Sequence, residues 1–174
     1  MMTKEDIISK AASTIFGKPL VTNVYRSVIV EAIINAALPA EWKWCSADYF
    51  EYDFVHPDGT RLEVKQSAMK QTWQTVGTPR PQWDIAERKT VWIDNKRVHA
   101  PGRNADIYVL GLHEVTDDTA DHREPEQWRF FVVPTFSLPL ASKKIGLGPA
   151  RRLANPVDVV GLAYAVETAR RQAY

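Results

Sequence analysis

Hydrophobic and polar residues alternate most regularly between residues 49 and 68, where two β-rich runs flank the tetrapeptide His56-Pro57-Asp58-Gly59. The φ angle of proline is preset for the second position of a type I turn, and glycine takes the following left-handed position at no steric cost. The pattern predicts a β-hairpin with a three-residue turn and a glycine bulge. In this hairpin His56 pairs with Thr60, and every further pair keeps the same sum of residue numbers.

The two faces of the predicted hairpin differ in polarity. One face is aromatic and aliphatic and belongs in a core: Phe50, Tyr52, Phe54, Leu62 and Val64. On the other face the register sets Asp53 opposite Glu63 and Glu51 opposite Lys65. Directly opposed carboxylates repel each other, so a compensating cation is expected, and hard cations such as magnesium take carboxylate oxygens. The alternative is a solvated outer face with one Glu51–Lys65 pair.

Two carboxylates, a lysine and a divalent cation suit the hydrolysis of a phosphodiester. Asp53, nine intervening residues and then Glu63-Val64-Lys65 resemble the D…(D/E)xK core of the PD-(D/E)xK, or restriction-endonuclease-like, nuclease superfamily. The resemblance implies that Asp53, Glu63 and the Val64 carbonyl hold Mg²⁺ or Mn²⁺, that Lys65 positions or activates the attacking water, and that DNA is the substrate. It also implies a glutamate on the helix before the hairpin, and Glu31 fits that place.

Other parts of the chain repeat the letters of this motif. Glu87-Arg88-Lys89 also has the form ExK, and Asp84 precedes Asp94-Asn95-Lys96 at the same offset. A buried strand favours an apolar middle residue, which Val64 supplies and Arg88 and Asn95 do not. The pair Pro57-Asp58, which matches the letters of the motif, lies at the tip of the turn. Several strand residues, each with a rise of about 3.4 Å, separate it from Glu63. Asp53, preceded by Tyr52 instead of proline, is the better match.

Three segments have helical spacing. Residues 23–38 form the clearest helix, ended by Pro39 and apolar on most sides except for a stripe of Ser27, Glu31 and Asn35. Glu31 lies either on a thin solvent-facing edge or in a polar cleft. Residues 3–16 predict a short helix with a capping box between Thr3 and Asp6, and a stripe for packing: Ile7, Ile8, Ala11, Ala12 and Ile15. Residues 157–171 predict a closing helix with these residues inside: Val160, Ala163, Tyr164 and Val166.

The remaining apolar runs predict strands. Residues 41–55 fit one or two strands with Trp42 and Trp44 in the core, residues 105–113 a central strand, and residues 128–135 a further strand. The order predicts an α/β fold with a central mixed β-sheet flanked by helices, in a single domain over residues 1–174. The resemblance to the nuclease superfamily covers residues 25–68 and extends to its restriction-endonuclease-like fold.

The formal net charge is +1, so a nucleic-acid site must be a local basic patch. Two segments supply one, and the first lies among Trp73, Trp83 and Trp92, which suit base stacking. The candidate phosphate-binding residues are Arg88, Lys89, Lys96, Arg97, Arg103, Lys143, Lys144, Arg151 and Arg152. The alternative is two ordinary loops, with the tryptophans in the core.

Composition limits the function classes. The single Cys45 excludes an internal disulfide framework and a zinc knuckle. The start of the chain lacks the apolar segment of a signal peptide, and no run reaches membrane-spanning length, so a cytoplasmic protein is expected. A divalent-metal-dependent deoxyribonuclease is the leading hypothesis. A non-catalytic nucleic-acid-binding module of the same fold and a metal-free structural protein stay open, as does a homodimer.

Overall fold

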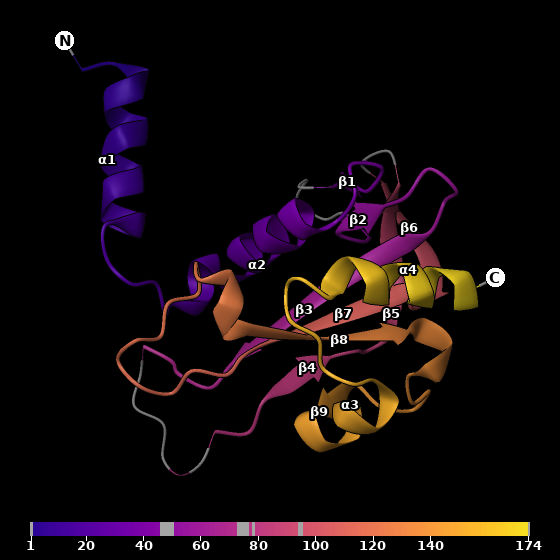
Figure 1. The fold of residues 1–174 in the computed structure, drawn as a ribbon. Helices are drawn as coiled ribbons and strands as arrows, with labels where there is room; N and C mark the ends of the chain where they lie inside the picture. Colours follow the sequence, from indigo (N-terminus) through magenta and orange to yellow (C-terminus); the bar gives the residue numbers. More distant parts are fainter. Residues whose placement is uncertain (1, 46–50, 73–76, 78, 94–95, 174) are drawn as a thin grey trace.

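A computed structural model describes residues 2–45, 51–72, 77, 79–93 and 96–173, with only the backbone of residues 91–93. The protein has an α/β fold built on a five-stranded mixed sheet with the strand order β1-β2-β3-β7-β8 (Figure 1). The strands are β1 (Lys43–Trp44), β2 (Phe54–Val55), β3 (Arg61–Ala68), β7 (Ile107–His113) and β8 (Trp128–Pro134). The predicted α/β class and central mixed sheet are therefore confirmed.

The predicted hairpin joins β2 to β3. Phe54 pairs with Leu62 and Val55 with Arg61, in the predicted register. The turn closes through a hydrogen bond of 2.9 Å from the His56 amide to the Thr60 carbonyl, and Gly59 has a φ of 93°. Only glycine adopts this left-handed region without strain, which explains why local turn chemistry predicts the hairpin.

Strand β3 lies between β2 and β7. It pairs with β7 in parallel, from Leu62–Ile107 to Ala68–His113. All seven residues of β7 are buried, as expected for a central strand. The crossover between them holds β4 (Gln82–Asp84), β5 (Arg88–Ile93) and β6 (Lys96–Gly102). Since β5 and β6 pair only with each other among the described strands, they form a separate two-stranded sheet, and the alternative of an ordinary loop over this segment is wrong.

Helices α2 (Asn23–Ala37) and α4 (Leu162–Gln172) cover one face of the sheet (Figure 1). Phe54 and Leu62, both fully buried, lie in this core as predicted, together with Val64 and Trp42. Trp44 is only half-buried and packs against its margin. Phe50 lies outside the described residues, and Tyr52 packs against the core on the opposite face, so its predicted place beside Phe54 is wrong.

The other face of the sheet is covered by β4, β9 (Lys144–Gly146) and α3 (Leu147–Leu153). Trp83 of β4 is 1% exposed and donates a hydrogen bond of 3.0 Å from Nε1 to the Gly111 carbonyl. It pairs with the buried Ile145 of β9. The alternative of an ordinary loop over residues 143–152 is therefore wrong: because Ile145 is buried against Trp83, this glycine-containing segment forms a strand and a helix.

Helix α1 (Lys4–Phe16) has the predicted capping box, but none of its residues is buried, so the expected packing of its stripe is wrong. Helix α2 is buried on one side only, through Arg26, Val30, Ile33 and Ile34. Helix α4 begins at Leu162, later than expected. Val160 is exposed in the segment before the helix, and Tyr164 is exposed because Leu162, Val166 and Ala169 form the buried face of the helix. Short 3₁₀ turns, Pro125–Gln127 and Thr135–Ser137, flank β8.

Across the described part of the chain, every helix is too short or too polar to cross a membrane.

Candidate active site

Strand pairing between β2 and β3 breaks at Asp53. The Asp53 amide donates to the Leu62 carbonyl at 2.9 Å, although Leu62 is already the register partner of Phe54. Asp53 and Phe54 of one strand therefore both face Leu62 of the other, which is the arrangement of a β-bulge. The expectation that Asp53 lies directly opposite Glu63 is therefore wrong, because the bulge shifts Asp53 out of the simple register.

The bulge turns the Asp53 carboxylate toward the edge of β3. Its Oδ2 accepts a hydrogen bond of 2.6 Å from the Val64 amide. Since β2 pairs only as far as Leu62, this amide would otherwise lack a strand partner on that side. Backbone groups two residues apart on a strand point the same way, so the Val64 carbonyl faces the same edge as the Leu62 carbonyl. The Asp53 carboxylate and the Val64 carbonyl therefore meet at one broken sheet edge.

Glu63 and Lys65 project from the face of β3 opposite to the Val64 side chain. The Lys65 ammonium forms an ion pair with Glu63 Oε1, so the Glu51–Lys65 pair expected from the register is wrong. Glu63 is also the register neighbour of Tyr108 on β7. Burial and then the charge of Glu63 raise the pKa of the Tyr108 phenol to about 12, so this hydroxyl stays protonated beside the carboxylate.

Glu31 reaches the site from α2. Its Oε2 accepts a hydrogen bond of 3.0 Å from Trp44 Nε1 on β1. Trp44 is in turn fixed by stacking on Phe54, with ring centroids 6.3 Å apart. Glu31 is half-buried and bonded to Trp44, whereas Ser27 and Asn35 of the same stripe are exposed, so Glu31 does not lie on a solvent-facing edge.

The carboxylates of Glu31, Asp53 and Glu63 are partly withdrawn from water. Burial is the main cause that raises the pKa of all three, and the pKa of Asp53 reaches about 6. Neighbouring carboxylates raise these pKa values further: Glu31 raises the pKa of Asp53, Glu63 raises that of Glu31, and Asp53 raises that of Glu63. Lys65 opposes the shift in each case. The structure therefore brings together the four predicted catalytic residues, with three acidic groups against one lysine.

This donor set fits a divalent ion held by two carboxylates and a carbonyl. Asp53, Glu63 and Val64 offer hard oxygen ligands, the type that magnesium and manganese take. Glu31 completes no larger ligand group: among the described residues no three His, Cys, Asp or Glu side chains are arranged to hold a metal. A bound ion would replace the Lys65 ammonium as the partner of Glu63.

Several neighbours of the site were not anticipated from the sequence. Trp44 and Tyr108 carry no motif and are apolar by pattern, so only the register of their strands reveals them. Arg26, the one cation of α2, is 6% exposed and its Nε donates to Gln66 Oε1. Arg26 is therefore buried beside β3. A cation within a largely apolar helix is the feature of the sequence that could have indicated it.

The competing motifs take other places. Asp58, at the turn tip, accepts hydrogen bonds from Thr60 and pairs with Arg170 of α4, which keeps the pKa of its carboxyl below the ordinary range. Arg88 of the Glu87-Arg88-Lys89 sequence pairs with Asp84 at 3.3 Å. Its charge also lowers the pKa of Glu63, so Arg88 lies near the site. Asp94 and Asn95 lie outside the described residues.

The predicted phosphate-binding residues divide into two groups. The Arg103 guanidinium donates to the carbonyls of Ile85 at 2.7 Å and Pro139 at 2.8 Å, so it serves the fold. The other candidates are exposed, namely Arg88, Lys89, Lys96, Arg97, Lys143, Lys144, Arg151 and Arg152. Of the tryptophans expected to stack beside them, Trp83 is in the core, Trp73 lies outside the described residues, and Trp92 is described only by its backbone.

Compared with models of known protein families the sequence matches none, and no curated protein is significantly similar to it.

Proposed function

We propose that this protein is a divalent-metal-dependent nuclease that hydrolyses phosphodiester bonds of DNA, with a restriction-endonuclease-like fold. One observation carries the proposal: Glu31, Asp53 and Glu63 share a partly buried edge of the sheet with a single lysine. Lys65 and Arg88 offset part of this negative charge, yet the pKa of all three carboxyl groups stays raised. Such a cluster is typical of a site that binds a cation and performs chemistry.

Each residue has a role in this proposal. Asp53, Glu63 and the Val64 carbonyl would hold Mg²⁺ or Mn²⁺, which when bound would lower the pKa of a water molecule and offset negative charge on the phosphate. Lys65 donates hydrogen bonds, either to the attacking water or to a phosphate oxygen on which charge develops. Glu31, held by Trp44, would assist by accepting a proton from the attacking water, and its raised pKa favours proton uptake.

DNA is the proposed substrate because exposed cations accompany the site. The start of β5 brings Arg88 near Glu63, and the hairpin continues with Lys89, Lys96 and Arg97 on its surface. Such residues bind backbone phosphates irrespective of sequence. We therefore propose that DNA contacts strands β5 and β6 beside the acidic cluster.

A non-catalytic nucleic-acid-binding module of the same fold is the second candidate. The ion pair between Lys65 and Glu63 favours it, since that contact compensates Glu63 without a metal. Metal binding separates the two: a binding module needs no divalent ion, whereas the nuclease requires one at Asp53 and Glu63.

The test is cleavage of plasmid and linear DNA in the presence of Mg²⁺ or Mn²⁺. We expect the wild type to cleave and chelation to stop the reaction, and we expect Lys65→Ala and Glu63→Gln to be inactive. Lys89→Ala, from the competing ExK sequence, is the matched control: it should at most weaken DNA binding and should retain the cleavage rate at saturating DNA. A Glu63→Gln, Lys65→Ala double variant that cleaves at the wild-type rate would remove the assignment.

A further inference from the structure

Strands β5 and β6 form a two-stranded ribbon that is fixed to the core at its base. The Arg103 guanidinium, next to the end of β6, donates to the Ile85 carbonyl at 2.7 Å and to the Pro139 carbonyl at 2.8 Å. Ile85 lies just before β5 and is 1% exposed, so this end of the ribbon is anchored. Beyond the base, β5 and β6 pair only with each other among the described strands, and we call the pair the β5–β6 ribbon.

Both faces of β6 are in water. Lys96, Arg97, Val98 and His99 are all exposed. Successive side chains of a strand point to opposite faces, so Arg97 and His99 lie on one face and Lys96 and Val98 on the other. A two-stranded ribbon without a covering layer is marginally stable in water. The β5–β6 ribbon is therefore suited to a partner that contacts both of its faces.

The charge of this segment indicates which partner that is. Residues 88–103 contain five Lys or Arg residues and one Asp, a formal charge of +4, whereas the whole chain carries only +1. The rest of the chain is therefore net acidic, at −3. Lys96 and Arg97 form no ion pair with any described residue. A concentrated positive charge on an otherwise acidic protein is complementary to a polyanion such as a nucleic acid.

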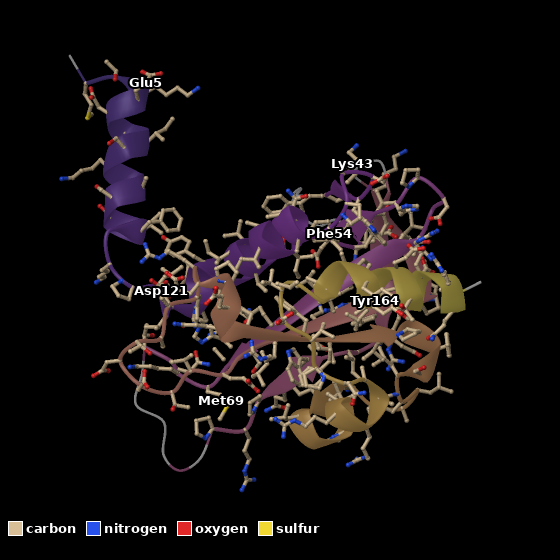
Figure 2. All side chains as sticks on the ribbon, in the orientation of Figure 1. Glu5, Lys43, Phe54, Met69, Asp121 and Tyr164 are labelled. Carbon is tan, nitrogen blue, oxygen red and sulfur yellow. The ribbon has the colours of Figure 1, made fainter. Side chains whose placement is uncertain are left out.

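The ribbon lies on the side of the molecule that carries the candidate active site. The charge of Arg88, at the start of β5, lowers the pKa of Glu63, so the two side chains are close. Figure 2 shows Phe54, the neighbour of Asp53, toward the side on which Figure 1 draws β6, whereas Asp121 and helix α1 lie on the other side. A nucleic acid bound to the ribbon would therefore lie beside the acidic cluster.

The width of the ribbon favours the major groove of double-stranded DNA. Paired strands lie about 4.8 Å apart, and side chains extend from both faces of the pair. The major groove of B-form DNA is about 12 Å wide and admits a two-stranded ribbon, whereas the minor groove is only about 6 Å wide. The major groove of an RNA duplex is too narrow for side chains to read. A single strand has no groove and would leave one face of the ribbon in water.

Arg97 is arranged to contact a base. Its Nε donates a hydrogen bond of 2.9 Å to Thr90 Oγ1 on the neighbouring strand, and the residue is exposed. Among the described residues, no acceptor binds the terminal nitrogens Nη1 and Nη2 of this guanidinium. Thr90 therefore fixes the side chain by one nitrogen and leaves the other two for a ligand. Bidentate donation from arginine to O6 and N7 of guanine is the commonest specific contact in the major groove.

We propose that the β5–β6 ribbon enters the major groove of double-stranded DNA, where Arg97 donates two hydrogen bonds to O6 and N7 of a guanine. The proposal rests on the proposed function only in taking DNA as the partner, and it adds the form of the DNA and the residue that distinguishes its bases. Lys96, on the opposite face of β6, contacts a backbone phosphate, which contributes affinity without sequence preference.

The first experiment identifies the form of nucleic acid. Fluorescence anisotropy in excess chelator measures binding of the full chain to three probes of equal length, namely duplex DNA of mixed sequence, one of its strands, and duplex RNA of the same sequence. We expect duplex DNA to bind at least about 10-fold more tightly than either of the others. Duplex RNA is the matched control, because it carries the same phosphate charge. Single-stranded DNA or duplex RNA that binds as tightly as duplex DNA would overturn the proposal.

The second experiment identifies the groove and the residue. A duplex in which 7-deazaguanine replaces guanine lacks the N7 acceptor in the major groove and keeps its base pairing. The wild type should bind this duplex at least about fivefold more weakly than ordinary DNA, and Arg97→Ala should bind the two equally. Lys96→Ala is the matched control, since it removes one charge from the same strand: it should weaken binding to both duplexes by the same factor. Thermal unfolding verifies that each variant is folded.

The comparison of the two duplexes needs only the wild type, so it tests the proposal whether or not a variant folds. A wild type that binds both duplexes equally, or a folded Arg97→Ala variant that still discriminates between them, would overturn the proposal. Cleavage separates this result from the proposed function. A protein that cleaves with Mn²⁺ but does not discriminate lacks only the ribbon contact, whereas a protein that discriminates but never cleaves lacks only the nuclease activity.

Discussion

The Val64 amide lies 2.6 Å from Oδ2 of Asp53, so a side-chain carboxylate occupies the place of a strand partner at the edge of β3. The same residue both satisfies a backbone donor and carries charge in a site where burial raises its pKa to about 6. These two roles conflict near neutral pH. Any oxygen acceptor satisfies the Val64 amide, whereas the negative charge of Asp53 is repelled by Glu31.

Asp53→Asn and Asp53→Ala separate these two tasks. Asparagine keeps an acceptor oxygen for Val64 and removes the charge, so the metal-free protein should become more stable at neutral pH. Alanine leaves the Val64 amide unpaired, which costs about 1–3 kcal/mol relative to asparagine. Urea unfolding measures both. The folded-state pKa of Asp53 is raised, so protonation favours folding, and the advantage of asparagine should shrink as the pH falls below about 6. An asparagine variant less stable than wild type at neutral pH would contradict this account.

Manganese should stabilise the wild-type protein. An ion that binds only the folded state at a hundredfold excess over its Kd adds about 2.7 kcal/mol, which for a chain of this size raises Tm by about 5–11 °C. Differential scanning fluorimetry with Mn²⁺ and then with chelator measures the shift. Asp53→Asn should lose the response. Equal shifts in wild type and Asp53→Asn would show that the ion binds elsewhere.

The sequence predicts the hairpin well because its determinants are local: Pro57 and Gly59 fix the turn, and the turn fixes the register. It does not predict the bulge at Asp53, which depends on where β2 ends. Nor does it predict that Lys65 pairs with Glu63, because the expected Glu51 contact needed the register to continue past the bulge. Local chemistry therefore predicts which residues form the candidate site, and strand pairing beyond the turn determines how they contact one another.

Segments whose structure depends on distant partners were predicted less well. The glycines of residues 143–152 favour a loop, but Ile145 is buried against Trp83 and the segment becomes a strand and a helix. The apolar stripe of α1 indicates a packed helix, yet periodicity cannot say which molecule supplies the packing surface. The restriction-endonuclease-like assignment itself stays a prediction.

Acid should destabilise the protein through two buried histidines. His113 and His122 are fully buried with ring centroids 4.7 Å apart, and burial followed by the neighbouring charges lowers the pKa of His122 to about 3. The unfolded chain binds this proton near pH 6.5, so stability present above about pH 6.5 is lost as the pH falls, at up to about 1.4 kcal/mol per pH unit for each histidine.

Urea unfolding between about pH 7 and about pH 4.5 measures this loss, and His122→Phe should flatten it. The window lies above the titration of Asp121, whose pKa is lowered to about 2. Protonation of the acidic cluster stabilises the folded protein as the pH falls, which partly offsets the effect of the histidines. Asp53→Asn removes this gain, so the loss of stability on acidification should become steeper. A wild type whose stability does not fall on acidification, or a His122→Phe variant that loses stability at the wild-type rate, would contradict the role of this histidine.

Affinity for DNA should fall steeply with salt, because each neutralised phosphate releases counterions. Lys96→Ala with Arg97→Ala, both exposed on β6, should reduce the slope of log K against log salt by about 0.9 for each phosphate that the variant no longer neutralises. Fluorescence anisotropy at several salt concentrations measures it. Lys10→Ala on α1 is the control and should leave the slope unchanged. Absence of binding at low salt would leave these residues as ordinary surface charges.

The strand that carries Glu63 and Lys65 obtains little support from its neighbour in sequence. β2 offers β3 two paired residues, whereas β7 offers seven and is synthesised only after the whole crossover between them. Pairing β3 with β7 requires closing that long loop before any contact compensates for the lost chain entropy, which slows folding. On the ribosome, Leu62 and Val64 therefore stay without their main partner until β7 emerges, and during that interval one edge of β3 remains unpaired.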